Sequence, residues 1–302
     1  MDFIEQNLAT IRSLYLHNMT VEEMVEADRR VESLFHFANG TWWLEVKPFF
    51  YRPAAMMARI VPRCRTPAPW RALGGYYHMV PDGVPNNGSI VVNEVPHPAS
   101  YELESLPKKV RSDIRRGLAG LQISRVSNLT DLLVDGYRIY LAWEKRMGSV
   151  RVKRSRQQVF SRWITRVFHH PHNLILGAYC ENRLVSYVVA QAVDGIADLS
   201  KSFTDPDFYH TNPSSALIFS YVRICGQNLN IHKVCNGLRS TKDSLERYKE
   251  KLGFQHVSYP AFIHLRLGLR SLVSWWMPEQ YRRLTGAYRS ESPIPPQPQS
   301  HE

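Results

Sequence analysis

The sequence predicts an α/β (α+β) fold built around one mixed central sheet, and three observations support this prediction. First, from residue 121 onward, apolar runs of strand length and apolar residues at helical spacing follow one another in the order β-α-α-β-β-β-α-β-α-β. Second, hairpin turns join the middle strands and helices separate the later ones, so antiparallel and parallel pairs share the sheet. Third, 302 residues, 44% of them hydrophobic, are enough for a substantial core.

The first hundred residues predict few regular elements. Residues 2–37 show apolar side chains at helical spacing, and the aromatic runs 42–44 and 49–51 are typical of strands. Prolines and glycines recur between residues 53 and 98, which predicts loops between short strands, and only 89–95 stands out as a strand. The residues of this region do not indicate a chemistry.

From residue 105 the pattern becomes regular. Ser105 is placed to cap a helix whose apolar residues recur every four positions and which ends at Gly117 and Gly120. Glu181–Arg183 and Asp194-Gly195 have the composition of tight hairpin turns. The elements expected after residue 120 are, in order, strand 121–126, helix 130–147, a helix capped by Ser155 and Gln158, strands 173–180, 184–193 and 196–203, a helix begun by Asn212-Pro213, strand 231–236, helix 241–252 and the extended stretch 254–267.

The positive charge of the chain is concentrated in one region. Residues 107–170 hold 15 Lys and Arg against 4 Asp and Glu, an excess of +11 that equals the net charge of the whole chain. A basic region on an otherwise neutral protein indicates an anionic partner. No recognised base-reading motif accompanies it, so DNA is not an expected partner.

Three features bear on the compartment. No uncharged apolar run approaches the ~18–20 residues of a membrane span, and the N-terminus is acidic where a secretion signal would be basic. The four cysteines show no metal-binding spacing, and three of them fall inside predicted strands or helices, as buried free thiols do. A cytoplasmic protein without structural disulfides is expected.

Three stretches resemble the FemAB-like branch of the GNAT acyltransferases, a mainly bacterial group that includes the peptidoglycan aminoacyltransferases. They are LPKKVRSDIRRGL at 106–118, DPDFYHTNPSSAL at 205–217 and YKEKLGF at 248–254. The predicted element order is also that of the GNAT fold. The resemblance implies a degenerate GNAT-like half over residues 1–104 and a GNAT acyltransferase domain over 105–270. Residues 271–302 would form an aromatic and basic segment with a disordered tail.

The resemblance implies transfer of an acyl group, most often acetyl, from a thioester to an amine or hydroxyl. Acetyl-CoA or acyl-CoA would then be a co-substrate, with no tightly bound cofactor. GNAT enzymes that use acyl-CoA usually carry Q/R-x-x-G-x-G/A before the central helix, but residues 210–215 contain no glycine. The helix N-terminus still offers N–H groups to an anion, so aminoacyl-tRNA fits equally well as donor. The expected donor-binding residues are Ser200, Ser202, His210, Thr211, Asn212, Ser214, Ser215 and Asn236.

Three residues are candidates for catalysis. Acyl transfer needs a base for the nucleophile and an acid for the leaving group. Asp198, on the predicted fourth strand of the GNAT half, is the candidate base, and Tyr248 the candidate acid. Lys249 matches the lysine of the family signature and could meet a phosphate or the oxyanion. The alternatives are a structural aspartate, a packing tyrosine one residue away from the usual position, and a solvated lysine.

The acceptor is expected to be anionic: a small molecule, a glycan or a lipid-linked precursor. The basic loop that would meet it contributes Arg146, Arg151, Lys153 and Arg154. His169, His170 and His172 have no nearby cysteine or acidic partner in the sequence, so no metal site is expected there. The aromatic segment ending at Trp275-Trp276-Met277 could lie on a membrane surface or dock onto the protein's own core.

Two other functions remain open. One is an aminoacyl-tRNA-dependent transferase of the FemABX type, in which the basic residues 107–156 would track a phosphate backbone. The other is a non-catalytic binding protein on a GNAT scaffold, which the missing glycines and the displaced tyrosine make plausible.

Overall fold

The computed structural model describes residues 3–29, 34–62, 66–68, 72–146 and 155–266, together with the single residues 275 and 281. The strands within these ranges are β1 (Asn18–Met19), β2 (Phe35–Ala38), β3 (Thr41–Lys47), β4 (Phe50–Pro53), β5 (Gly75–Met79), β6 (Gly88–Pro96), β7 (Gln122–Arg125), β8 (Leu174–Cys180), β9 (Arg183–Val193), β10 (Ile196–Thr204), β11 (Lys233–Leu238) and β12 (Gln255–Leu265). The helices are α1 (Phe3–Ser13), α2 (Val21–Arg29), α3 (Lys108–Gly120), α4 (Leu129–Asp131), α5 (Tyr137–Arg146), α6 (Ser155–His169), α7 (Pro213–Gly226) and α8 (Asp243–Lys251). Shorter turns are the 3₁₀ turns η1 (Pro98–Ser100), η2 (Leu103–Ser105) and η4 (Pro206–Thr211) and the π-helical turn η3 (Leu132–Gly136).

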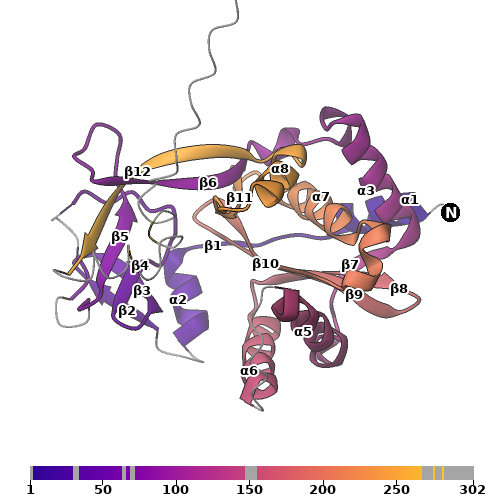
Figure 1. Cartoon of the computed structure of the whole chain (residues 1–302), viewed down its shortest axis with the longest axis horizontal. Coiled ribbons are helices and arrows are strands. Elements are labelled where there is room, and N and C mark those ends of the chain that lie inside the picture. Colours follow the sequence, from indigo (N-terminus) through magenta and orange to yellow (C-terminus); the bar gives the residue numbers. More distant parts are fainter. Residues whose placement is uncertain are drawn as a thin grey trace, which may run out of the picture.

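The described strands form one mixed sheet in the order β2-β3-β4-β5-β12-β6-β11-β10-β9-β8-β7, and β1 pairs with β9. Figure 1 shows α3, α7 and α8 on one face of the part of the sheet around β7–β11, and α5 and α6 on the other. The first face holds a core shared with α1, and the second a separate aromatic-rich core. α7 is buried along nearly its whole length and is the central helix of the fold.

The element order predicted from residue 121 is confirmed. β7, the helices α4 to α6, three antiparallel strands, α7, β11, α8 and β12 follow one another as the sequence pattern indicates. Both hairpin turns are confirmed as well: Glu181 and Asn182 have φ of 50° and 65°, and Asp194 and Gly195 have φ of 49° and 80°. Two successive residues with positive φ give the turn whose twist matches paired strands.

The helical pattern over residues 2–37 is confirmed only in part, because β1 separates two helices there. α1 ends at Ser13, β1 follows, and α2 is a separate helix before β2 begins at Phe35. A capping box explains the new start, because the Thr20 N–H donates to Glu23 Oε2 at 2.7 Å and the Glu23 N–H donates to Thr20 Oγ1 at 3.1 Å. β2 and β5 were not predicted, while the strands expected near 42–44, 49–51 and 89–95 are present as β3, β4 and β6.

One predicted helix cap is wrong, and another is in place without its side-chain hydrogen bond. Ser105 lies in η2 and donates its hydroxyl to Glu102 O at 2.7 Å, while α3 begins after Pro107, which carries no capping side chain. Asn212 precedes α7 as predicted, but it has φ of 56° and its side chain makes no capping bond. The fixed φ of Pro213, rather than a side-chain cap, therefore starts α7.

The first hundred residues are interleaved with the rest of the chain. β6 lies between β11 and β12, and β1 extends the edge of β9. The side chain of Asn7 joins α1 to the end of α3, because it donates to Leu118 O and Leu121 O and accepts from the Ile123 N–H, each at 2.7 Å. The division at residue 104 stays a prediction, and across it the chain builds one sheet.

Three further observations bear on the sequence predictions. Cys180, Cys225 and Cys235 are free and lie in β8, α7 and β11. None of the helices in the part of the chain that the structure describes is both long and apolar enough to cross a bilayer. The segment 271–302, apart from residues 275 and 281, lies outside the described residues.

Candidate active site

The central feature of the site is a fork between two parallel strands. β10 and β11 pair only where Ile196–Asp198 meets Lys233–Cys235. A bulge between Leu199 and Lys201 then bends β10, and the pairing of β11 with β6 shifts register after Cys235. Each irregularity breaks the regular ladder, so the two strands pair no further toward the start of α7.

Asp198 stands at the last pair before the fork. Its neighbours across the sheet are Gln191 on β9 and Cys235 on β11. Because Gln191 alternates with Val189 and Tyr187, which pack under α5 and α6, Asp198 faces that side of the sheet. Burial raises the pKa of the Cys235 thiol, and the nearby Asp198 carboxylate raises it further. The carboxylate thus lies at the fork beside a thiol that stays protonated.

A chain of hydroxyl groups connects β9 with α8 by way of the end of β10 and the start of α7. It consists of Ser186, Thr204, Ser214, Tyr248 and Ser215, and is called the hydroxyl chain below. The Oγ atoms of Ser186 and Thr204 are 2.7 Å apart, as are those of Thr204 and Ser214. The hydroxyl of Tyr248 lies 3.1 Å from the Oγ atom of Ser215, the residue that follows Ser214 at the start of α7.

The hydroxyl chain has a direction. The Ser186 hydroxyl donates its single proton to Phe203 O at 2.8 Å, because a carbonyl oxygen can only accept. Thr204 must therefore donate to Ser186, and Ser214 must donate to Thr204. The next residue of α7, Ser215, then makes the hydrogen bond to the Tyr248 hydroxyl.

Tyr248 stays protonated at neutral pH. Burial raises its pKa to about 12, and the negative charge of Asp113 on α3 contributes in the same direction. The hydrogen bond with Ser215 acts the opposite way, because it stabilises the phenolate. A protonated phenol with a hydroxyl placed to stabilise its anion is suited to donate a proton.

The first turn of α7 is closely covered by α3. A Cβ on Gly117 would lie 2.7 Å from Ala216 Cβ, 2.9 Å from Asn212 O and 3.4 Å from Thr211 O. Only a residue without a side chain lets the two helices approach this far. The N-terminus of α7 is therefore packed against protein on the side where the helix α3 lies.

Lys249 lies inside the protein. Its Nζ donates to Asn236 O at 3.0 Å and pairs with Glu246 Oε1 at 3.3 Å, and both side chains are less than a tenth exposed. His256 Nε2 lies 2.9 Å from the other oxygen of Glu246. The lysine thereby ties α8 to the end of β11 beside the fork.

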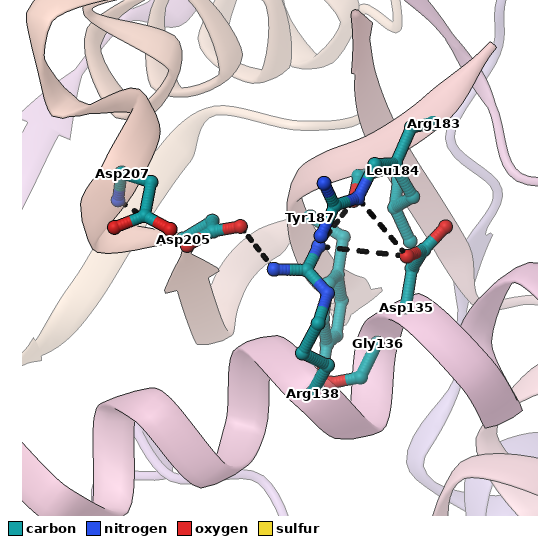
Figure 2. Close-up of polar contacts among 8 residues, drawn as sticks. All are labelled: Asp135, Gly136, Arg138, Arg183, Leu184, Tyr187, Asp205 and Asp207. Atoms are coloured by element: carbon teal, nitrogen blue, oxygen red, sulfur yellow. Dashed lines mark hydrogen bonds and ion pairs between the residues drawn. The ribbon is translucent and has the colours of Figure 1, made fainter.

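The turn that leads into α7 is anchored by Asp205 (Figure 2). Its carboxylate is 4% exposed and pairs with Arg138 Nη1 of α5, while it also accepts from the Asp207 N–H at 3.3 Å. Arg138 Nη2 reaches Asp135 Oδ1 at 3.5 Å and Leu184 O at 3.4 Å. The buried carboxylate is thus neutralised by a guanidinium from the opposite side of the sheet.

Arg146 also meets this turn. Its guanidinium hydrogen-bonds the Tyr209 hydroxyl and lies 5.5 Å from the centre of that ring. His210 is exposed and its ring stacks near Phe208, while Thr211 donates to Phe208 O at 2.8 Å. The structure therefore brings a residue predicted for the acceptor next to residues predicted for the donor.

The remaining predicted residues are distributed as follows. Ser202 is exposed on β10 beyond the fork, and Ser200 lies at the bulge of the same strand. Asn236 lies at the irregular end of β11. Arg151, Lys153 and Arg154 lie outside the described residues. No group of three or more His, Cys, Asp and Glu side chains in the described ranges could hold a metal ion.

Several residues of the site were not found from the sequence. Ser186 and Thr204 could have been noticed as hydroxyls in otherwise apolar strands, and Asp113 as the one acidic residue of a basic helix. Arg138 and Asp205 are 67 residues apart and carry no local signal of their pairing.

No protein-family model matches the sequence, and no curated protein matches it either. Solved structures do match. FemX aligns with 90% of this chain and 98% of its own, with a TM-score of 0.56 and 9% identity. The C-terminal domain of an Agrobacterium fabrum protein described as a lysylphosphatidylglycerol synthetase aligns with 89% of this chain and 97% of its own, with a TM-score of 0.53 and 10% identity.

These likenesses extend over nearly the whole chain, including the first hundred residues. Together with the order of elements, the forked parallel strands and the central helix, they establish the architecture. The protein has a GNAT-like, FemAB-like fold.

Proposed function

We propose that this protein is an acyltransferase that moves an aminoacyl group from the oxygen ester of a charged tRNA to an amine or hydroxyl of an anionic acceptor. The observation that carries the proposal is the hydroxyl chain, which leads to the first turn of α7, where Ser215 lies 3.1 Å from the protonated phenol of Tyr248. Asp198 occupies the last strand pair before the fork between β10 and β11.

In this reaction the acceptor nucleophile attacks the carbonyl carbon of the ester and forms the new bond. Asp198 takes the proton that the nucleophile loses. The bond between the carbonyl carbon and the ester oxygen then breaks, and Tyr248 gives its proton to that oxygen. Ser215 continues to donate to the phenol oxygen and stabilises the phenolate.

The acidity of Tyr248 favours an oxygen ester over a thioester. A thiol has a pKa of about 8.5, so its thiolate is too weak a base to take a proton from a phenol of much higher pKa. An alkoxide is a stronger base than that phenolate and needs the proton to leave. With the pKa of Tyr248 raised to about 12, an acid at this position serves an alcohol leaving group.

The covered N-terminus of α7 favours the same donor. A CoA pyrophosphate would have to reach backbone N–H groups at the first turn, but Gly117 of α3 packs on Thr211, Asn212 and Ala216 there, and Ser215 is buried. An acyl-CoA donor is the contrasting candidate, and it requires α3 to move away from α7.

The surface charge near Tyr248 is suited to a polyanion. On α3, Lys108, Lys109 and Arg116 are exposed, and on α8 Arg247 and Lys251 are exposed on either side of the tyrosine. Cations on both flanking helices would neutralise phosphates on the way to the fork, and binding should weaken steeply with salt. The whole-chain likeness to FemX supports an aminoacyl donor.

The acceptor is proposed to be anionic. The Agrobacterium protein with the same fold is described by a product, lysylphosphatidylglycerol, that joins an amino acid to an anionic lipid. Arg146 lies at the end of α5, next to the turn that leads into α7. A phosphate or carboxylate of an acceptor would find this guanidinium beside the fork.

Binding of three probes in parallel tests the donor: charged tRNA, uncharged tRNA and a long-chain acyl-CoA, each at low and high salt. We expect the tRNA to bind with a strong salt dependence and the acyl-CoA to leave the melting temperature unchanged. Lys108→Gln with Lys109→Gln should weaken tRNA binding, whereas Lys47→Gln, an exposed lysine on β3, should not. If only acyl-CoA raises the melting temperature, the donor is a thioester and not an ester of tRNA. If none of the three probes binds, a non-catalytic scaffold is favoured.

A further inference from the structure

Helix α5 is tied to the turn before α7 at two places. Arg138 pairs with Asp205, the residue that precedes η4, and Arg146 contacts Tyr209 near its end. The two arginines are eight residues apart, about two helical turns, and lie on one side of α5. The turn and its 3₁₀ geometry are thereby held against a helix from the other face of the sheet.

The π-helical turn places the first of these contacts. η3 spans Leu132–Gly136, and Gly136 O accepts from the Tyr187 hydroxyl at 3.4 Å. Such an insertion rotates the residues that follow it and recurs at functional sites. Asp135, within the π turn, accepts from Arg138 and also lies 3.5 Å from Arg183 Nε. The Arg138 guanidinium is therefore held between Asp135 and Asp205 (Figure 2).

Asp205 is the point where this network meets the hydroxyl chain. Its neighbour Thr204 carries the Oγ1 that lies 2.7 Å from Ser214 Oγ, and the next residue, Ser215, lies 3.1 Å from the Tyr248 hydroxyl. The Asp205 N–H donates to Val185 O at 2.9 Å, which keeps Thr204 opposite Ser186. A displacement of the Asp205 carboxylate therefore moves Thr204 and, through it, the first turn of α7.

We propose that Arg138 is a positioning residue for the candidate acid: by neutralising the buried Asp205 it fixes Thr204 and Ser214, and thereby the Tyr248 hydroxyl. The catalytic meaning of this role rests on the function proposed above, in which Tyr248 protonates the leaving group. The mechanical role does not depend on it. Without the guanidinium, Asp205 is a buried carboxylate that must rotate toward water or take up a proton.

The test places 3-fluorotyrosine at position 248 and records its ¹⁹F resonance in the full-length protein. We expect Arg138→Gln to shift this resonance, because the serines at the start of α7 no longer hold the phenol in place. Arg138→Lys keeps a positive charge beside Asp205, so its resonance should lie closer to the wild-type position. Arg183→Gln is the matched control: Arg183 touches the same Asp135 but not Asp205, and it is 49% exposed. The control should leave the resonance unchanged.

An unchanged ¹⁹F resonance in folded Arg138→Gln would overturn the proposal, even if the melting temperature falls, because the ion pair would then be only local. Should Arg138→Gln fail to fold, Asp205→Asn removes the same charge pair and is judged by the same resonance. The two proposals fail separately. If Tyr248→Phe leaves turnover unaffected, the function is wrong, while the ¹⁹F measurement still decides whether Arg138 positions the phenol.

Discussion

The hydroxyl oxygens of Tyr248 and Ser215 lie 3.1 Å apart, at the first turn of the central helix α7. In this arrangement the first turn of α7 binds the side chain of Tyr248. The phenol is held by Ser215 and shielded by α3, and it remains a proton donor throughout the neutral range.

The raised pKa of Tyr248 predicts a loss of stability at alkaline pH. The folded-state pKa of about 12 lies above the unfolded value of 10.0, so the stabilising contribution is complete below pH 10 and is lost as the pH rises through 12. For two pKa units this amounts to about 3 kcal/mol. Urea unfolding between pH 8 and 11.5 should show the wild-type protein losing more stability than Tyr248→Phe, and parallel curves would contradict the assignment.

Gly117→Ala is predicted to disturb the site through packing alone. Its new Cβ would lie 2.7 Å from Ala216 Cβ and 2.9 Å from a backbone oxygen, so α3 must move away from α7 at a cost of about 1–3 kcal/mol. Gly120→Ala is the control, because nothing lies within 4 Å of its added methyl group. Thermal unfolding should separate the two variants, and equal melting temperatures would show that the helices are not packed this closely.

Lys249 and Glu246 are predicted to behave as a buried structural pair. Lys249→Met leaves the Glu246 carboxylate without its cation and should destabilise the protein by about 3–5 kcal/mol. Replacing both, with Glu246→Gln and Lys249→Met, should cost less than the single change, since no buried charge then remains. If Lys249→Met lost activity at unchanged stability, the lysine would instead act on substrate, as the family resemblance implies.

Asn7→Ala is predicted to loosen the N-terminal helix. The side chain is 2% exposed and makes three hydrogen bonds of 2.7 Å to the end of α3 and the start of β7. Its removal leaves buried groups unpaired, at about 1–3 kcal/mol for each group. Gln6→Ala, an exposed neighbour on the same helix, should stay within about 0.5 kcal/mol of wild type. Chemical denaturation of both variants checks the difference.

The second half of the chain was predictable because its signals are local. Asp194-Gly195 makes a hairpin and Asn212-Pro213 starts a helix whatever the remainder of the sequence does. The first hundred residues gave weaker signals for the opposite reason. β5 begins at Gly75 with φ of 126° against His264 O, and β6 lies between two strands from the far end of the chain. Such pairings depend on contacts across more than 130 residues.

The site shows the same division. Asp198 and Tyr248 could be selected by residue type and position in a familiar element order; Asp198 lies at the last pair of β10 with β11, and Tyr248 lies against Ser215 of α7. The partners of Tyr248 could not be selected, because the hydroxyl chain joins residues 186, 204, 214 and 248, which share no sequence pattern. The Arg138–Asp205 pair likewise becomes visible only when α5 lies against the turn before α7.

Transfer from charged tRNA tests the central claim most directly. Radiolabelled aminoacyl-tRNA would be incubated with the protein and with lipid and acid-soluble extracts as acceptor pools, and label in an RNase-resistant product would be counted. We predict transfer by the wild-type protein, a loss of about 10²-fold or more in Tyr248→Phe, and no comparable loss in Tyr101→Phe, a nearby buried tyrosine whose hydroxyl donates to Leu252 O. Label that stays on the RNA while acyl-CoA yields product, or full activity in Tyr248→Phe, would contradict it.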